Sequence, residues 1–134
     1  MSPDTSEDDL LRSTMPFVRT LGIRTVASTP SEVRARLDWA EELCTSGGVL
    51  HGGAIMALAD STGGACAFLN LPEGAGTTTV ESKTNFLRGV TEGQVEAVAR
   101  PLHVGRRFVV VDTDLFDDRG KRVARVTQTQ AVLI

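Results

Sequence analysis

Cysteine is scarce in this sequence, and positive charge is nowhere concentrated. The two cysteines among the 134 residues, Cys44 and Cys66, lack CxxC or CxxH spacing, which argues against a disulfide framework and a metal site. We expect both to be free thiols, buried or half-buried, in a reducing compartment. Lysine and arginine do not form the basic patch that binds nucleic-acid phosphates, and the formal net charge is −3, so no nucleic-acid partner is expected.

The sequence also shows neither the pattern of a transmembrane helix nor that of a signal peptide. No uncharged apolar run reaches the roughly 18 residues from which a transmembrane helix is inferred. The beginning of the sequence is acidic and lacks the basic and apolar regions of a signal peptide. We therefore expect a cytoplasmic protein with no membrane partner. The length suits a single domain, residues 1–134, in which residues 1–5 are expected to be disordered.

Most of the remaining pattern is typical of β-strands. In the segment 33–39, apolar residues alternate with charged ones, which is the two-residue period of a strand with one solvated face. Four later segments are rich in Val, Thr and Phe and are separated by turn signals. These segments are 77–88, 94–104, 106–116 and 122–133, with breaks at 89–93 and 117–120.

Two helical segments interrupt this pattern. The acidic run at 6–9 resembles a helix start, so we expect a short helix or two turns, interrupted at Pro16 and closed by Gly22. Residues 53–69 are apolar on nearly every side, which predicts one long helix enclosed by other structure. Five or six antiparallel strands and one such helix predict an α+β fold in which a curved sheet wraps round the helix.

The segment 47–60, GGVLHGGAIMALAD, is the best candidate for carrying chemistry. Glycines at a loop-to-helix junction let the backbone approach a ligand, and the first N–H groups of a helix lack internal partners. Such a terminus suits a phosphate or the oxyanion of a tetrahedral intermediate. A phosphate loop is excluded because no Lys-Ser/Thr follows the glycines and the GxGxxG spacing is absent. The oxyanion interpretation remains, beside that of a plain tight turn.

Asp60 is the only acidic or basic residue between His51 and Glu73 and lies within the helix that we expect to be buried. A buried charge is costly unless it is paired or used in function. The functional interpretation is a general base or nucleophile in a desolvated pocket. The alternative is a structural one, in which Asp60 caps a second helix that begins at Ser61 or bonds locally near the following glycines.

His51 also has two interpretations, a loop residue bonded to the backbone or a residue of the site. The only other histidine is His103, and no Cys or carboxylate stands at ligand spacing, so no metal site is expected. A Ser-His-Asp triad is poorly supported because the G-x-S-x-G motif is missing.

The spacing of Gly52 and Asp60 restricts how they can act together. Eight residues correspond to about 12 Å along a helix axis, whereas a reacting carbonyl must lie about 3 Å from both the oxyanion donor and the attacking group. One helix cannot provide this geometry, but two antiparallel copies can. An acyl-transfer site would therefore require a homodimer with composite sites, in which Gly52 of one subunit faces Asp60 of the other.

The sequence resembles the PaaI-type acyl-CoA thioesterases of the hotdog superfamily. That family's loop, HGG motif and helix with an acidic residue nine positions after the His are matched by His51-Gly52-Gly53 and Asp60. Further similarity covers nearly the whole chain. It includes Pro16-Phe17, Leu21-Gly22-Ile23, residues 79–88, residues 103–107 and residues 118–121.

The resemblance implies a hotdog fold and hydrolysis of an acyl-CoA, without a cofactor beyond the CoA of the substrate. Asp60 would attack the thioester or activate water, and the Gly52 N–H would polarise the carbonyl. His51 would position the carbonyl or the leaving sulfur, with Gly53 beside it. Thr79, on a strand across the interface, matches a hydroxyl that holds the water in some members.

Other implied contacts belong to substrate binding. Arg106, and with less support Arg107 and Arg88, would meet the phosphates of CoA, although a solvated strand face also explains these arginines. Thr45 stands where many members carry Asn or Gln beside the carbonyl, and its shorter side chain is a departure from the family pattern.

We expect the acyl pocket to be lined by the helix at 57–67, by residues near 43–50 and by the partner's residues 77–81. The acyl group itself, small aryl or medium-chain, is not fixed by these residues. A dimer of such dimers is expected. Two alternatives to hydrolysis stay open: a non-catalytic acyl-CoA-binding hotdog protein, and a hotdog hydratase or dehydratase that uses His51 and Asp60.

Overall fold

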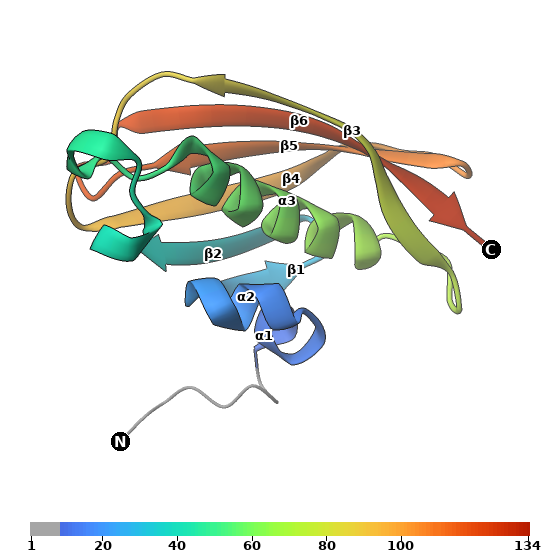
Figure 1. The fold of residues 1–134 in the computed structure, drawn as a ribbon. Coiled ribbons are helices and arrows are strands. Elements are labelled where there is room, and N and C mark those ends of the chain that lie inside the picture. The colour runs from blue at the N-terminus through green and yellow to red at the C-terminus, as the bar shows by residue number, and fades with distance from the viewer. Residues whose placement is uncertain (1–8) are drawn as a thin grey trace.

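Six antiparallel strands form one sheet in the computed structural model, which describes residues 9–134 (Figure 1). Their order across the sheet is β1-β2-β4-β5-β6-β3. The predicted strands are confirmed to within a residue or two at their ends, and β1 is an additional edge strand. The strands are β1 (Arg24–Thr29), β2 (Glu32–Asp38), β3 (Gly76–Phe86), β4 (Gln94–Val104), β5 (Phe108–Phe116) and β6 (Arg122–Leu133).

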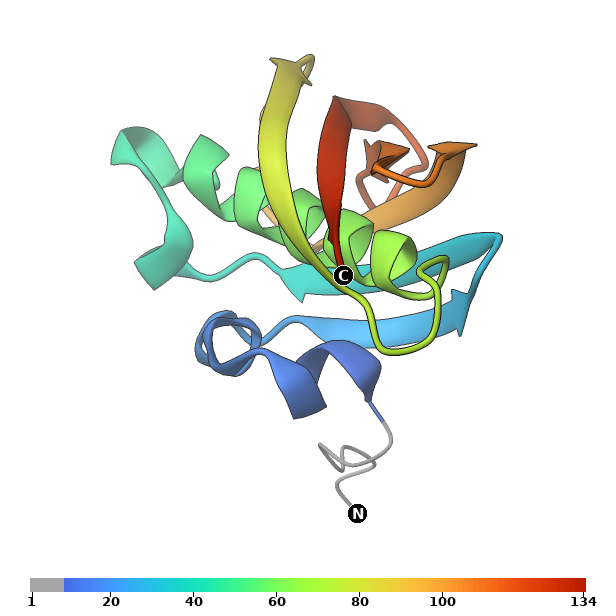
Figure 2. The same ribbon diagram turned by 90° about the vertical axis from the view of Figure 1, so that its right-hand side faces the viewer.

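The long helix α3 (Gly52–Phe68) lies along the concave face of this sheet (Figures 1 and 2). Its sheet-facing side is made mainly of small residues, and Leu58, Ala59 and Cys66 are fully buried. Small side chains let the helix axis approach the strands closely, and the core forms between the two layers. The predicted α+β architecture is therefore confirmed.

The prediction that α3 is enclosed on every side is wrong for the single chain. Met56 and Phe68 are 41% and 52% exposed, and Asp60 between them is exposed as well. These residues lie about one helical turn or a multiple of it apart, so they form one stripe along the helix. The sheet covers only the opposite side, and β3 ends the sheet next to this stripe.

Two short helices, α1 (Leu10–Thr14) and α2 (Pro16–Leu21), precede the sheet. The carboxylate of Asp9 accepts hydrogen bonds from the backbone N–H groups of Arg12 at 3.1 Å and Thr25 at 2.7 Å, which ties α1 to β1. Gly22 ends α2 with a φ of 79°, a left-handed conformation that favours glycine. The two predicted turns closed by Gly22 are confirmed, whereas the expected helix start at Ser6 and the expected disorder of residues 1–5 lie outside the described residues.

Both cysteines are free thiols, Cys66 buried in α3 and Cys44 half-buried in the loop before it. Burial raises the pKa of the Cys66 thiol to about 11. Between residues 9 and 134, no helix combines the length and the hydropathy needed to cross a bilayer.

The two thiols should differ sharply in reactivity. Because only the thiolate is alkylated and the pKa of Cys66 lies about three units above pH 8, about one Cys66 in a thousand is ionised at that pH. We expect iodoacetamide to modify Cys44 in the native protein at pH 8 and Cys66 only after unfolding in urea, as read by mass spectrometry of the peptides. Equal labelling of both cysteines in the native protein would contradict the burial of Cys66.

Candidate active site

The loop that leads into α3 consists of two short 3-10 turns, η1 (Glu41–Leu43) and η2 (Ser46–Gly48). His51 follows as the N-cap of α3, and its Nδ1 accepts a hydrogen bond from the Gly53 backbone N–H at 2.7 Å. Because Nδ1 accepts, the neutral imidazole carries its proton on Nε2. A Cβ at Gly53 would lie 2.9 Å from that Nδ1, so only glycine allows this contact.

Gly52 is the first residue of α3, and its environment explains why it is a glycine. A Cβ at this position would lie 3.1 Å from the ring of Phe86, so the start of the helix packs directly against the end of β3. The N–H groups of Gly53 and Ala54 bond to His51. Within residues 9–134, the Gly52 N–H makes no hydrogen bond. A free donor therefore remains at the positive end of a long helix, where it can stabilise an oxyanion.

Asp60 lies two turns further along α3 and faces β3 and β6. Its Oδ1 accepts hydrogen bonds from the hydroxyl of Thr79 at 3.1 Å and from Nε2 of Gln128 at 3.3 Å. Contrary to the prediction of a buried carboxylate, Asp60 is exposed in the single chain because no strand continues the sheet beyond β3. The alternative that Asp60 caps a second helix is also wrong, since α3 continues without a break to Phe68.

Gln128 and Gln130 complete the polar group around Asp60. Nε2 of Gln130 donates to the Thr79 hydroxyl at 2.7 Å, and the Thr77 hydroxyl lies 3.2 Å from Oε1 of Gln130. Neither glutamine was among the site residues predicted from the sequence. Their positions in the strand could have indicated this role. Both glutamines occupy the alternate positions of β6 that face inward, where an apolar side chain would be expected.

A cavity of about 350 Å³ opens beside Asp60. In the part of the chain that the structure describes, Asp60 is the only titratable residue in its lining. The other lining residues come from α1, α3, β3 and their neighbours: Leu10, Thr14, Met15, Gly64, Ala65, Phe68, Thr77, Thr78, Thr79 and Gln130.

The helix lines this cavity, as predicted. Because β3 runs alongside α3 in the same chain, threonines 77–79 of this chain also border it, together with α1. Residues 43–50 of the same chain lie at the other end of α3, and the prediction that they and a partner's residues complete the acyl pocket concerns the dimer and stays a prediction.

The remaining predicted residues are spread over the two ends of the sheet. Thr45 is exposed in the loop before α3, where its backbone N–H bonds to the Val49 carbonyl at 2.8 Å. Arg88 follows β3 at the same end as Gly52. Arg106 and Arg107 are exposed in the turn between β4 and β5, near the end of β6 and the start of β3. One chain thus brings together Asp60 and Thr79, but not Gly52 and Asp60, nor the three arginines.

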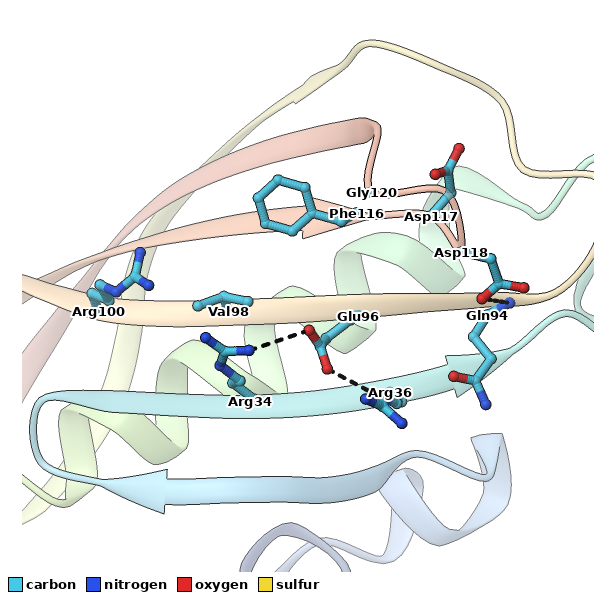
Figure 3. A pocket seen from close by; sticks show the side chains of 10 residues that line it. All are labelled: Arg34, Arg36, Gln94, Glu96, Val98, Arg100, Phe116, Asp117, Asp118 and Gly120. Atoms are coloured by element: carbon cyan, nitrogen blue, oxygen red, sulfur yellow. Dashed lines mark hydrogen bonds and ion pairs between the residues drawn. The ribbon is translucent and has the colours of Figure 1, made fainter.

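A larger hollow, about 530 Å³, lies on the outer face of the sheet, far from α3 (Figure 3). Its charges neutralise one another: Arg34 and Arg36 lie 3.6 and 3.0 Å from Glu96, and Arg100 lies 3.1 Å from Glu32. The hydrogen bond from Arg34 holds the pKa of Glu32 below its ordinary value. Since the arginines in this hollow are occupied by neighbouring carboxylates, its size alone does not make it a site, and Asp60 is the stronger candidate.

Comparison with known proteins identifies the family of this chain. A family model described as the thioesterase superfamily matches residues 47–124, a range that includes His51, Gly52 and Asp60. The 1,4-dihydroxy-2-naphthoyl-CoA hydrolase of Escherichia coli is 35% identical over 86 residues, which are 64% of this chain and 63% of that protein.

Solved structures extend the likeness to nearly the whole fold. A thioesterase of Pseudomonas aeruginosa, solved as a mutant, superimposes with a TM-score of 0.88 at 32% identity and covers 99% of this chain and 96% of its own. The phenylacetic acid degradation protein PaaI of Thermus thermophilus gives a TM-score of 0.80 at 26% identity, covering 87% of this chain and 97% of its own. The resemblance to PaaI-type proteins is thereby confirmed, and the chain belongs to the thioesterase superfamily of hotdog-fold thioester hydrolases.

Proposed function

We propose that this protein hydrolyses an acyl-CoA to a carboxylate and free CoA, with Asp60 as the reacting carboxylate. The observation that carries the proposal is the position of Asp60, which among the described residues is the one titratable group at a largely apolar cavity of about 350 Å³. A cavity of this size suits a small aryl or medium-chain acyl group, because its wall offers apolar side chains and threonines but no charge to pair with a second carboxylate.

Two chemical routes are open to Asp60. As a general base it takes a proton from water while the water oxygen bonds to the thioester carbon; as a nucleophile it forms an anhydride that water then cleaves. In both routes the C–S bond breaks and the CoA sulfur leaves as a thiolate that takes up a proton. The developing oxyanion needs a donor, for which we propose the N–H of Gly52, while Nε2–H of His51 is free to contact the carbonyl or sulfur.

The oxyanion donor would come from a second subunit. β3 is an eleven-residue edge strand without proline, and Val80 and Phe86 on it are 58% and 51% exposed. A long, unprotected edge of this kind favours pairing with another strand. The adjacent exposed stripe of α3, with Met56 and Phe68, would be covered by the same partner, and two copies related by a two-fold axis satisfy both surfaces.

The charges of β3 suggest the register of this pairing. Glu81 and Lys83 flank Ser82, so antiparallel self-pairing centred on Ser82 sets Glu81 of each copy opposite Lys83 of the other. The same register sets Phe86 opposite Thr78 of the second copy. Because Phe86 packs on Gly52 and Thr79 bonds to Asp60, the Gly52 N–H then approaches the other subunit's carboxylate.

Binding of the CoA moiety follows from the same arrangement. Antiparallel pairing brings the β4–β5 turn of one copy toward the end of the other at which Arg88 lies. We propose that Arg106 meets the CoA phosphates, with Arg107 and Arg88 near them, and that Thr45 and Gly53 border the thioester. A dimer of such dimers remains our expectation for the assembly.

Replacing the carboxylate tests the proposal directly. Asp60→Asn keeps the size of the side chain but removes the charge, and we expect kcat to fall by at least about a hundredfold. The measurement is release of free thiol from benzoyl-CoA and octanoyl-CoA, followed with a chromogenic disulfide. Glu73→Gln removes an exposed carboxylate outside the cavity and serves as the control. Unchanged turnover in Asp60→Asn would refute the proposal, and tight binding without turnover by the native protein would favour a non-catalytic role.

The composite site can be tested by complementation. Gly52→Pro removes the N–H at a helix position that tolerates proline, and His51 already has the extended φ and ψ, −62° and 135°, that a residue before proline needs. Gly52→Ala brings the same Cβ against Phe86 but keeps the N–H, so we expect it to retain most of the activity that Gly52→Pro loses.

Mixing then identifies the subunit that supplies each group. Gly52→Pro and Asp60→Asn, each inactive alone, should recover about a quarter of the native activity when they are refolded together, because half the dimers are mixed and each has one intact site. Sites within one chain would give no recovery.

The proposed β3–β3 register, centred on Ser82, predicts how exchanging the charges of Glu81 and Lys83 affects the dimer. Glu81→Lys and Lys83→Glu should each weaken the dimer, by about tenfold in Kd, because each substitution sets like charges opposite one another. The double exchange restores the pairing and should return the dissociation constant, measured by sedimentation equilibrium, close to its native value. Equal weakening by all three variants would place Glu81 and Lys83 outside such pairs.

A further inference from the structure

Two glutamines of β6 are buried under Asp60, although the positions they occupy belong to the core. Gln128 is 0% and Gln130 2% exposed, and both continue the inward-facing row of Ala124 and Val126. Burying a carboxamide costs about 1–3 kcal/mol unless hydrogen bonds compensate it, so Leu or Met would make the more stable core here. The hydrogen bonds of these glutamines therefore indicate what they are for.

The hydrogen bonds lead to one atom, Oδ1 of Asp60. Gln130 donates to the Thr79 hydroxyl, so the single hydroxyl hydrogen of Thr79 is left to donate to Asp60. Gln128 donates to the same Oδ1. In the part of the chain that the structure describes, Oδ2 of Asp60 receives no hydrogen bond. One carboxylate oxygen is thus held twice, and the other is left for reaction at the cavity.

The position of Gln128 requires a glycine at residue 63, and this glycine lowers the stability of the helix. A Cβ at Gly63 would lie 1.9 Å from Oε1 of Gln128 and 2.6 Å from its Cδ, so the carboxamide occupies the space of a missing side chain. A glycine inside a helix is less favourable than alanine by about 1 kcal/mol. Glycine is nevertheless required here, because a side chain would fill the space in which the Gln128 amide lies between α3 and β6.

Gln128 also leaves one of its own atoms unsatisfied. Its Oε1 is buried and has no hydrogen-bond partner among residues 9–134, whereas its NH2 group faces Asp60. The opposite amide orientation would set Oε1 against a carboxylate oxygen, which is repulsive for an ionised Asp60. The orientation of Gln128 is therefore determined by the carboxylate and not by the packing around it.

We propose that Gln128 and Gln130 are positioning residues that clamp Oδ1 of Asp60, directly and through Thr79, so that Oδ2 is the reacting oxygen. The proposal rests on the proposed role of Asp60. No other titratable side chain lines the cavity from any element packed against Asp60 within residues 9–134, so this clamp is built from neutral donors alone.

Gln128 gives the sharpest kinetic test because it holds Asp60 without lining the substrate cavity. Gln128→Met keeps an unbranched side chain but removes the donor. We expect kcat for benzoyl-CoA or octanoyl-CoA to fall about tenfold with KM unchanged, since a misplaced reacting group slows the chemical step. Thr113→Val is the matched control: it also removes a fully buried polar group from the sheet, and in the described part of the chain the Thr113 hydroxyl has no hydrogen-bond partner and no bond to Asp60.

A second variant covers the case in which Gln128→Met does not fold. Gly63→Ala adds only a methyl group, yet it must displace the Gln128 amide, and we expect the same loss of kcat at unchanged KM. In a double-mutant cycle, Gln128→Met should cost nothing further in an Asp60→Asn background, because the clamp has lost the oxygen that it positions. Additive losses would overturn the proposal, and so would a Gln128→Met protein with native kcat.

A measurement without turnover separates this inference from the proposed function. In protein labelled with carboxyl-¹³C aspartate, the Asp60 resonance is the one that Asp60→Asn removes. We expect Gln128→Met to shift that resonance and Thr113→Val to leave it in place. An unshifted resonance would refute the clamp even if Asp60 proves catalytic. A shifted resonance together with full activity of Asp60→Asn would refute only the hydrolytic mechanism.

Discussion

The close approach of α3 to β3 and β6 is the constraint on which the rest of the structure depends. It is made by two glycines: Gly52 lies against the ring of Phe86, and Gly63 lies against the carboxamide of Gln128. An aspartate side chain is short, so Asp60 reaches Thr79 only because the helix lies this near to the strand. A side chain at Gly63 would displace the Gln128 amide from Asp60, and a side chain larger than that of alanine at Gly52 would press the start of the helix away from Phe86.

The glycines that allow this close approach also give α3 a sequence with a low intrinsic helix propensity. Glycine is the least favourable residue in a helix interior after proline, and α3 contains glycines at both ends of the site. The helix is held instead by burial, through Ile55, Leu58 and the alanines that face the sheet. Stability and site geometry therefore share one cause, since the small residues that bury well are also those that admit the neighbouring strands.

Much of this could be predicted from sequence because the relevant signals are local. The two-residue alternation located β2, the Val-, Thr- and Phe-rich segments between turn signals located β3 to β6, and the HGG motif located the start of α3. The edge strand β1 was not singled out because it is exposed along most of its length and so lacks an apolar phase. The prediction of a buried Asp60 fails for the single chain for a related reason: α3 is apolar on all sides in composition, and composition does not show which side the sheet leaves open.

The role of Gln128 and Gln130 could not be predicted from the sequence for a different reason. A glutamine in a strand is normally interpreted as a residue of the solvated face, and only its phase relative to Ala124 and Val126 contradicts that interpretation. Their partner Asp60 is separated from them by β3, β4 and β5 along the chain, so no local pattern connects the three residues. Contacts of this kind become visible only when the order of the strands is known.

The open side of α3 links the chemistry to assembly. Asp60, the cavity and the edge of β3 all lie where the single chain exposes apolar and unpaired surface, while the Gly52 N–H lies about 12 Å away along the helix. A carboxylate exposed to water reacts in a high-dielectric environment, where oriented donors contribute little. A second chain that pairs with β3 would exclude that water and bring the missing donor at the same time. The surface that an isolated chain leaves unsatisfied is therefore the surface on which its site is completed.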